Sequence, residues 1–262
     1  MPLSKEALQY APWSYTMANV AHICPFHFHQ KYIVRAKSEE TVRIDSEVGI
    51  AVHQILDWCI RGVTVDAAYS KAVQDLNLTY AAEIAIHNYR TAIEEFLQGL
   101  IIFRKKQQVI RVESEKRIGI TQDFSLTQYK ATDCFIRGAI DLTLFTKNKC
   151  AVIIDHKSGT RKKLDTYSNQ MAIYALLINA IAPDIDSIRT AVHYVGANKN
   201  KKGTRTEWGP EYPIEIVQTR FRENIIIWLN DAARAIQTMD TKKSWLCNFC
   251  GYRYLCPQYK GQ

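Results

Sequence analysis

Two segments with strand-like periodicity, joined by a short polar turn, are the feature that most constrains the fold of this chain. Residues 135–145 and 150–157 follow a period of two, and Lys147-Asn148-Lys149 lies between them. This pattern predicts an antiparallel hairpin. Asp141 and Asp155 both lie seven residues from the turn centre at Asn148. We therefore expect them to face each other on neighbouring strands, with Cβ atoms roughly 5 Å apart.

The second strand of this hairpin predicts a charged face. Alternate side chains of a strand share a face, so Asp155 and Lys157 should point one way and His156 the other. Two opposed carboxylates repel each other, and a divalent cation such as Mg²⁺ or Mn²⁺ would remove that cost. The alternative is a solvent-facing carboxylate pair with Lys157 as its ion-pair partner. Taken alone, the triplet Asp155-His156-Lys157 favours the solvent-facing pair, because D-x-K triplets are common in proteins.

The remaining periodicity predicts an α/β fold. Helices are expected at 14–34, 46–61, 79–107, 166–182 and 213–239, and further strands at 109–120 and 187–195. This order indicates a central mixed sheet flanked by helices. We predict a single domain over residues 1–262, made of a mainly helical part (1–108), a core (109–240) and a cysteine-rich tail (241–262).

The charge of the chain suits a polyanionic partner. The net charge is +8 and the pI is about 9.0, and lysine and arginine release counterions when they bind phosphates. Many basic proteins bind nothing acidic, so charge alone does not decide. Candidate phosphate contacts lie in two basic runs, for which the alternative is a solvated surface: Arg161, Lys162 and Lys163 in the first, and Lys199, Lys201, Lys202 and Arg205 in a loop at 198–205.

The cysteine pattern predicts a site that binds a metal ion or an iron–sulfur cluster rather than disulfides. The chain lacks a run of about 20 apolar residues, and its first residues, MPLSKEALQY, lack the apolar core of a signal peptide. We therefore expect an intracellular protein with reduced thiols and no membrane partner. Three cysteines close the chain, Cys247, Cys250 and Cys256, and Cys24 is the best fourth ligand because it shares the Cys-Pro pair of Cys256-Pro257. Spacing alone leaves zinc and an iron–sulfur cluster open. The other cysteines, Cys59, Cys134 and Cys150, read as packing residues.

Several motifs together resemble one enzyme family. Gly138-Ala-Ile-Asp141 followed by Asp155-His-Lys-Ser-Gly159 resembles the G-x-I-D and D-x-K-T/S-G signature of RecB-type nucleases in the PD-(D/E)XK superfamily. Gly49-Ile-Ala-Val-His53 resembles the G-x-x-V-H motif of that family, and Gln170-Met-Ala-Ile-Tyr174 resembles its Q-x-x-x-Y motif. Either Glu115 or Glu113 matches a weakly defined acidic position. The motifs occur in the family order over nearly the whole chain.

The resemblance implies a restriction-endonuclease-like core and a metal-dependent hydrolysis of phosphodiesters. His53, Asp141, Asp155 and the backbone carbonyl of His156 would hold Mg²⁺ or Mn²⁺, with the carboxylates and Lys157 acting in catalysis. Gln170 and Tyr174, at i and i+4 on one helix face, would complete the catalytic set. Read in isolation, His53 is more often a core histidine than a ligand.

The cysteine pattern resembles the iron–sulfur subclass of these nucleases, which includes the AddB nuclease domain and CRISPR-associated adaptation exonucleases. It implies a [4Fe–4S] cluster held by Cys24, Cys247, Cys250 and Cys256, with structural Zn²⁺ as the alternative.

The function implied is a DNA exonuclease acting on free, single-stranded ends in recombination, repair or CRISPR spacer acquisition. The alternatives are an endonuclease or flap nuclease of the same family and a DNA-binding module without catalysis. No phosphate-binding G-x-x-x-x-G-K-S/T motif is present. A motor, if the protein needs one, would therefore be a separate subunit. A helicase or an integrase-type protein is a candidate partner.

Overall fold

The structure, a computed structural model, describes residues 2–39, 43–159, 161–196 and 203–259. The chain forms two compact units, each built from separate segments. The first unit comprises Met1–Thr41, Ile118–Gly138 and Gln218–Gln262, and the second comprises Val42–Arg117 and Ala139–Val217. The division into a helical part, a core and a tail that the sequence suggests stays a prediction.

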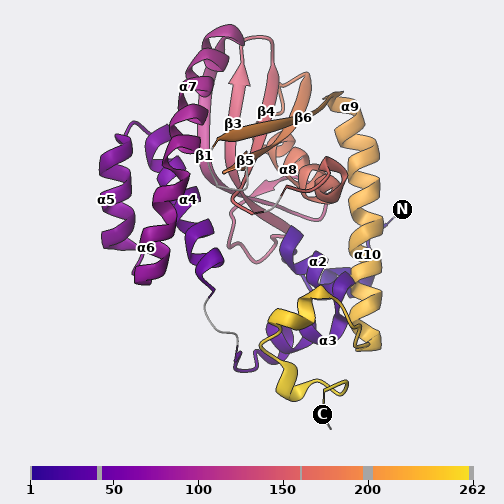
Figure 1. Cartoon of the computed structure of the whole chain (residues 1–262). Coiled ribbons are helices and arrows are strands. Elements are labelled where there is room, and N and C mark those ends of the chain that lie inside the picture. Colours follow the sequence, from indigo (N-terminus) through magenta and orange to yellow (C-terminus); the bar gives the residue numbers. More distant parts are fainter. Residues whose placement is uncertain (1, 40–42, 160, 197–202, 260–262) are drawn as a thin grey trace. The chain divides into compact units, whose positions relative to one another are not determined.

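A six-stranded mixed sheet confirms the predicted fold class (Figure 1). Its order is β2-β1-β3-β4-β5-β6, in which β4 and β5 are parallel and the pairs β1/β2, β3/β4 and β5/β6 are antiparallel. The strands are β1 (Val109–Ile120), β2 (Leu126–Thr127), β3 (Ile136–Thr146), β4 (Cys150–Lys157), β5 (Ser187–Val195) and β6 (Thr204–Pro213).

Helices cover both faces of the sheet within the second unit (Figure 1). One face packs against α4 (Ile44–Ile60), α5 (Val65–Asp75), α6 (Tyr80–Ile86) and α7 (Arg90–Lys106). Its core includes Leu142, Ile154 and Ala191 from the three central strands. The opposite face packs Val192 and Tyr194 of β5 against Met171 of α8 (Ser168–Ile181). The central strands β4 and β5 beside the candidate site are therefore buried on both faces.

The predicted hairpin is present in the predicted register. Leu142 pairs with Ile154 and Phe145 pairs with Ala151, which is the alignment centred on Asn148. The described pairing of β3 with β4 includes Leu142 but not the preceding residue, Asp141. Strand β4 itself continues to pair with β5 as far as Lys157. Asp141 thus lies where β3 stops pairing with β4.

Two helices expected from the sequence are interrupted. The expected helix at 14–34 divides into α2 (Tyr15–Ile23), α3 (Pro25–Phe28) and a π-helical segment, η1 (His29–Val34). Cys24 is extended there, with φ −154°, because a residue that precedes proline is pushed out of the helical region. The helix expected at 79–107 is broken by a 3-10 turn at His87–Tyr89.

Further elements differ from the sequence prediction. The sequence does not predict strand β6, whose first two residues fall in the expected loop at 198–205. Proline is tolerated in β6 because it is an edge strand. Helix α5 was not predicted, and the last long helix, α10 (Arg222–Thr238), begins only after the short α9 (Ile214–Ile216) and the π-helical Val217–Phe221.

The first unit is mainly helical. Its α1 (Lys5–Gln9), α2 and α3 contact α10, and the cysteine-rich tail forms two short 3-10 turns, Trp245–Phe249 and Arg253–Leu255. Among the described helices of either unit, none is both long and apolar enough to cross a bilayer.

Candidate metal and catalytic site

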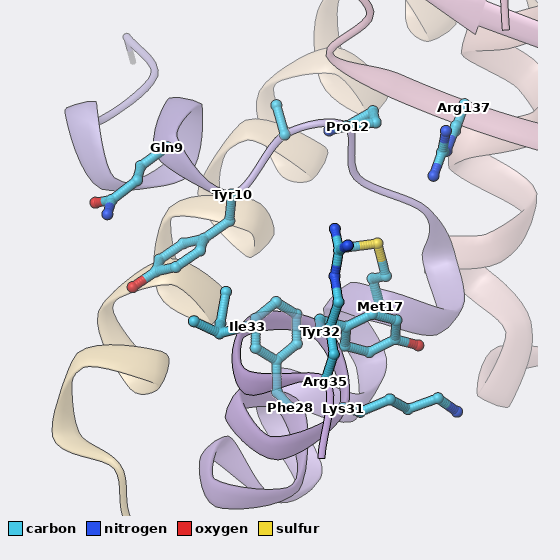
Figure 2. Close-up of a pocket in the computed structure, with 11 residues that line it drawn as sticks. Gln9, Tyr10, Pro12, Met17, Phe28, Lys31, Tyr32, Ile33, Arg35 and Arg137 are labelled. Carbon is cyan, nitrogen blue, oxygen red and sulfur yellow. The ribbon is translucent and has the colours of Figure 1, made fainter. Parts of the chain in front are cut away.

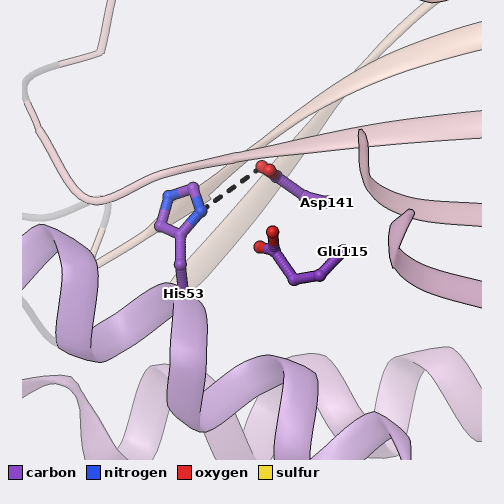
Figure 3. Close-up of side chains that lie close together, drawn as sticks. All are labelled: His53, Glu115 and Asp141. Atoms are coloured by element: carbon purple, nitrogen blue, oxygen red, sulfur yellow. Dashed lines mark ion pairs between the residues drawn. The ribbon is translucent and has the colours of Figure 1, made fainter. Parts of the chain in front are cut away.

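Three potential metal ligands converge in the second unit. One ligand atom each from His53, Glu115 and Asp141 lies within 4.8 Å of the others (Figure 3). His53 is on α4, Glu115 on β1 and Asp141 on β3. The Nδ1 atom of His53 lies 3.5 Å from Oδ2 of Asp141. One imidazole and two carboxylates form a donor set suited to a divalent cation.

The backbone at Glu115 explains why this glutamate joins the group. Glu113 and Glu115 would share a face in a regular strand, but Glu115 has a φ of 49°, in the left-handed region. Glu113 instead lies near Arg111 and Lys116, at 4.0 and 3.8 Å. The choice between the two glutamates, which the sequence left open, is therefore settled by a local break in strand geometry.

A polar network holds this part of β1 against α4. The buried carboxylate of Asp57, one turn after His53, accepts hydrogen bonds from Ser114 at 2.5 Å and from Arg61 at 2.8 Å. Arg61 also donates to the backbone carbonyl of Ser114 at 3.0 Å. Ser114 immediately precedes Glu115, so the network fixes the strand at the left-handed residue. Sequence reasoning missed Asp57, Arg61 and Ser114, because none of them belongs to a motif.

Asp141 occupies the point at which β3 and β4 separate. Its Oδ2 atom accepts a hydrogen bond of 2.6 Å from the backbone N–H of His156. The carboxylate therefore takes the place of a strand partner for β4 while it remains within reach of His53. This arrangement couples one candidate ligand directly to the D-x-K segment.

Asp155 and Lys157 share a face, as alternation predicts. Oδ2 of Asp155 lies 2.6 Å from Nζ of Lys157 in an ion pair without hydrogen-bond geometry. Gln170 on α8 donates to Oδ1 of Asp155 at 2.8 Å and to the hydroxyl of Tyr174 at 3.0 Å, and its Oε1 accepts from Lys157 at 3.4 Å. The two motifs thus form one connected group.

Asp155 does not belong to the compact set of three donors. Its side chain is only 2% exposed and is engaged by Lys157 and Gln170. The roles assigned to Asp155 and to the backbone carbonyl of His156 as metal ligands stay predictions. The donor set that the structure brings together contains Glu115 in addition to the expected His53 and Asp141.

Electrostatics within the site are dominated by burial and by neighbouring carboxylates. Burial and the negative charge of Asp141 raise the pKa of Glu115 to about 7. Burial and Asp141 also raise the pKa of Asp155 to about 7, although Lys157 opposes this shift. Burial disfavours ionised Asp141, but the hydrogen bond and charge of His53 hold its pKa below the usual value. The same interactions outweigh burial and raise the pKa of His53.

His156 points to the opposite face, as predicted, and packs among aromatic rings. Its ring meets Phe96 of α7 edge-on at 5.1 Å, and its Nδ1 lies 2.8 Å from Nδ1 of His193 on β5. Burial lowers the pKa of His156 to about 3. A neutral histidine pair therefore supports β4 on the side of the sheet that α7 covers.

Gly49, the first residue of the G-x-x-V-H motif, lies close to the end of β4. A Cβ at this position would stand 3.1 Å from Oγ of Ser158. The absence of a side chain at Gly49 therefore leaves room for the side chain of Ser158.

The predicted basic runs are only partly described. Lys199, Lys201 and Lys202 lie outside the described residues. Arg205, expected in a loop, is instead in β6 opposite Tyr194. Arg161 and Arg205 both form ion pairs with Glu207. The backbone carbonyl of Lys162 accepts a hydrogen bond from Tyr194, and Lys162 and Lys163 are exposed.

The four expected cysteines gather in the first unit. Cys24 and Cys256 are buried and share a small apolar cluster with Phe26. The pKa of the Cys250 thiol is raised by burial and further by the nearby thiols of Cys24, Cys247 and Cys256. Within the described part of the chain, no three of these sulfurs lie within 4.8 Å of one another.

Comparison with known proteins agrees with this geometry. The model of the PD-(D/E)XK nuclease superfamily matches residues 12–257. The structure of a candidate exonuclease from Eubacterium rectale is similar over 99% of this chain and 93% of that chain, with a TM-score of 0.51 and 9% identity. That likeness concerns the fold alone. The structure of SSO0001 aligns with 93% of this chain and 95% of its own, with a TM-score of 0.37 and 14% identity.

No curated protein matches the sequence. The family match spans the whole candidate site, from His53 on α4 to Tyr174 on α8, and both strands of the hairpin. The chain belongs to the PD-(D/E)XK nuclease superfamily.

Proposed function

We propose that this protein is a divalent-metal-dependent deoxyribonuclease, an exonuclease that hydrolyses phosphodiester bonds at single-stranded DNA ends. The observation that carries the proposal is the convergence of His53, Glu115 and Asp141 within 4.8 Å, next to the connected pair of Asp155 and Lys157. This combination provides both a cation site and an ammonium group for a phosphate.

The donor set fits Mg²⁺ or Mn²⁺. Burial and the negative charge of Asp141 hold the pKa of Glu115 at about 7, and a divalent cation would relieve the repulsion between the two carboxylates. When bound, the ion would lower the pKa of a water molecule and stabilise negative charge on the phosphate. His53, Glu115 and Asp141 would hold it, and Asp155 is a further candidate ligand.

Lys157 is placed to act on the phosphate. Its side chain is 27% exposed, and its ammonium group is fixed by Asp155 at 2.6 Å and by Gln170 at 3.4 Å. The ammonium can therefore offset the charge of a bound phosphodiester or orient a nucleophilic water. Tyr174, one turn later on α8, accepts a hydrogen bond from Gln170, so Lys157, Gln170 and Tyr174 form one chain of contacts that positions the ammonium group.

Cleavage of end-labelled single-stranded and duplex DNA with Mg²⁺ or Mn²⁺ tests the proposal. Asp141→Asn and Lys157→Ala should abolish cleavage. Asp75→Asn and Lys71→Ala make the same charge changes at an exposed ion pair of α5 and should cut like the wild type. If the wild-type protein leaves both substrates intact with either cation, the proposed activity is wrong, and a DNA-binding module without catalysis is favoured.

Circular single-stranded DNA separates the exonuclease from the alternative endonuclease or flap nuclease. An enzyme that requires a free end leaves the circle intact while it degrades the linear form. Cleavage of the circle would reject the exonuclease proposal and retain the nuclease. Release of mononucleotides from 5′- or 3′-labelled strands would then give the polarity.

We also propose that Cys24, Cys247, Cys250 and Cys256 hold a [4Fe–4S] cluster. The nearness of these four thiols in the first unit supports a shared thiolate-bound centre, for which structural Zn²⁺ is the alternative. Anaerobic purification with a visible absorption spectrum and analysis of iron, sulfide and zinc tests this. Stoichiometric zinc without iron would reject it.

A further inference from the structure

The first unit contains a cavity of about 420 Å³ that no motif of the sequence predicts (Figure 2). It is lined by the turn after α1, by η1 and its end, and by the start of β3. Aromatic and basic side chains dominate its lining, which includes Tyr10, Tyr32, Lys31, Arg35 and Arg137. Its size falls within the range of sites that bind small molecules or single nucleotides.

The cavity is electropositive. Lys31, Arg35 and Arg137 line it, and no acidic side chain is among the described residues that do so. None of the three cations forms an ion pair with a described carboxylate. Figure 2 shows the side chains of Arg35 and Arg137 reaching towards the same opening. Three cations without a nearby counter-charge favour an anionic ligand.

The backbone conformation of Arg35 also supports a binding site at this cavity. Arg35 ends η1 with a φ of 55°, in the left-handed region where glycine is the relaxed residue. An arginine held in this conformation with its side chain at a cavity is an outlier of the kind that gathers at binding sites.

The other side of the cavity is aromatic and rigid. Phe28 is fully buried and packs against Tyr10 at 5.9 Å and Tyr32 at 5.0 Å between ring centroids. Trp13 supports Phe28 from behind at 6.0 Å. Tyr10 and Tyr32 are thus held in place while they remain partly exposed. Fixed aromatic rings beside cations are the combination that binds single-stranded nucleic acid, through stacked bases and neutralised phosphates.

We propose that this cavity binds one nucleotide of a single-stranded DNA substrate, with its base against Tyr10 or Tyr32 and its phosphates against Lys31, Arg35 and Arg137. The inference rests on the proposed function for the identity of the strand as DNA. It adds a second point of contact, in the first unit, to the cleavage site in the second unit. An inorganic anion would use the cations alone and would leave the aromatic side without a role.

Binding of a fluorescently labelled oligo(dT) to the full chain in EDTA, measured by anisotropy, tests the proposal without cleavage. Arg35→Ala and Arg137→Ala should each weaken binding roughly tenfold, as expected for a lost charge-assisted hydrogen bond. Each should also reduce the slope of log affinity against log salt by about 0.7, the value for one single-strand phosphate. Arg234→Ala, which removes an exposed arginine of α10, is the matched control and should change neither quantity.

The aromatic side has its own test. Tyr32→Ala should weaken oligo(dT) binding roughly tenfold, the range measured for a lost base stack, whereas Tyr32→Phe should bind like the wild type. Thymidine monophosphate should compete with the oligonucleotide at a lower concentration than inorganic phosphate. Equal competition by phosphate, or equal binding by Tyr32→Ala, would overturn the nucleotide assignment. Thermal melting confirms that each variant is folded, and Arg137→Gln replaces Arg137→Ala if it is not.

Failure of this inference is distinguishable from failure of the proposed function. Hydrolysis of bis(p-nitrophenyl) phosphate with Mn²⁺ reports on the cleavage site alone, because this small diester does not need the cavity. If the arginine variants keep wild-type oligo(dT) affinity, the inference is overturned, whatever the hydrolysis result. Weaker oligo(dT) binding with unchanged diester hydrolysis supports it.

Discussion

The hydroxyl group of Ser114 donates a 2.5 Å hydrogen bond to the carboxylate of Asp57, and this contact ties β1 to α4 beside the candidate metal site. Asp57 lies one helical turn after His53, and Ser114 immediately precedes Glu115. Arg61 closes the network by contacting both Asp57 and the carbonyl of Ser114. The network thereby links the segments that carry two candidate metal ligands, His53 on α4 and Glu115 on β1.

Replacement of Arg61 should therefore affect metal binding. Arg61→Ala removes the donor to the Ser114 carbonyl and leaves buried Asp57 with fewer partners, so we expect a loss of about 1–3 kcal/mol in unfolding free energy. The looser position of Glu115 should raise the Mn²⁺ concentration needed for half-maximal cleavage several-fold. Urea unfolding and a Mn²⁺ titration of activity measure the two effects.

Arg90→Ala is the matched control for this variant. Arg90 forms exposed ion pairs with Asp66 and Glu94 on the outer helices, so its loss should cost less than about 1 kcal/mol and leave the Mn²⁺ requirement unchanged. An Arg61→Ala protein with the wild-type Mn²⁺ requirement would show that the network does not position Glu115.

The titration of Glu115 should lower the stability of the metal-free protein as pH rises from about 4.5 to 7. The pKa of Glu115 is raised by burial from 4.5 to about 7, so over this window the unfolded chain has lost the proton that the folded protein still holds. Glu115 therefore stabilises the fold at the acidic end of this window and does so less towards neutral pH. Buried His156, whose pKa is lowered to about 3, contributes with the opposite sign. The difference in urea midpoints between the wild type and Glu115→Gln, measured across this window in EDTA, isolates the contribution of Glu115.

Glu115→Gln should flatten part of this pH dependence, because an amide does not titrate. Glu94→Gln, at an exposed ion pair, should leave the profile as in the wild type. Asp155, with its pKa also raised to about 7, should still contribute with the same sign in the Glu115 variant. Wild-type and Glu115→Gln proteins whose urea midpoints change in parallel with pH would contradict the predicted protonation of Glu115.

Substitutions of Gln170 and of Tyr174 should lower the kcat of cleavage by different amounts. Gln170→Ala removes contacts to Asp155, Lys157 and Tyr174 together and leaves the buried Asp155 carboxylate with one partner fewer. We expect a reduction of kcat by roughly tenfold to a hundredfold, from 1–3 kcal/mol of lost positioning. Tyr174→Phe loses only the hydroxyl that contacts Gln170, so its kcat should fall less. Equal losses would place Tyr174 in direct contact with the substrate.

The cysteine site should control the stability of the first unit. Cys256→Ala removes one of the four gathered thiols and should lower the iron content and the melting temperature together, since ligand binding and folding are linked. Cys150→Ala, at the start of β4, should retain the iron. Full iron content in Cys256→Ala would exclude this residue as a ligand.

Local periodicity accounts for much of the site. Strand alternation places Asp155 and Lys157 on one face, and the helical repeat places Gln170 and Tyr174 together. The turn centred on Asn148 fixes the register of β3 and β4. These relationships depend on residues a few positions apart, so the sequence carries them directly. The mixed sheet with helices on both faces follows from the order of such segments.

Other features were decided only when distant segments packed together. Period two could not distinguish Glu113 from Glu115, because a regular strand has no left-handed residue. In the structure Glu115 has a left-handed φ, and the preceding Ser114 is hydrogen-bonded to Arg61 and Asp57 of α4. The edge strand β6, and with it Arg205, formed through backbone pairing with β5 in spite of its prolines.

The sequence by itself determined the family motifs, the hairpin register and the faces of Asp155, Lys157, Gln170 and Tyr174, because backbone geometry repeats over short distances. The tertiary structure decided which carboxylates meet His53 and that Tyr10, Tyr32, Arg35 and Arg137 line one cavity. Those residues come from separate segments of the chain, and only the packing of these segments can bring them together.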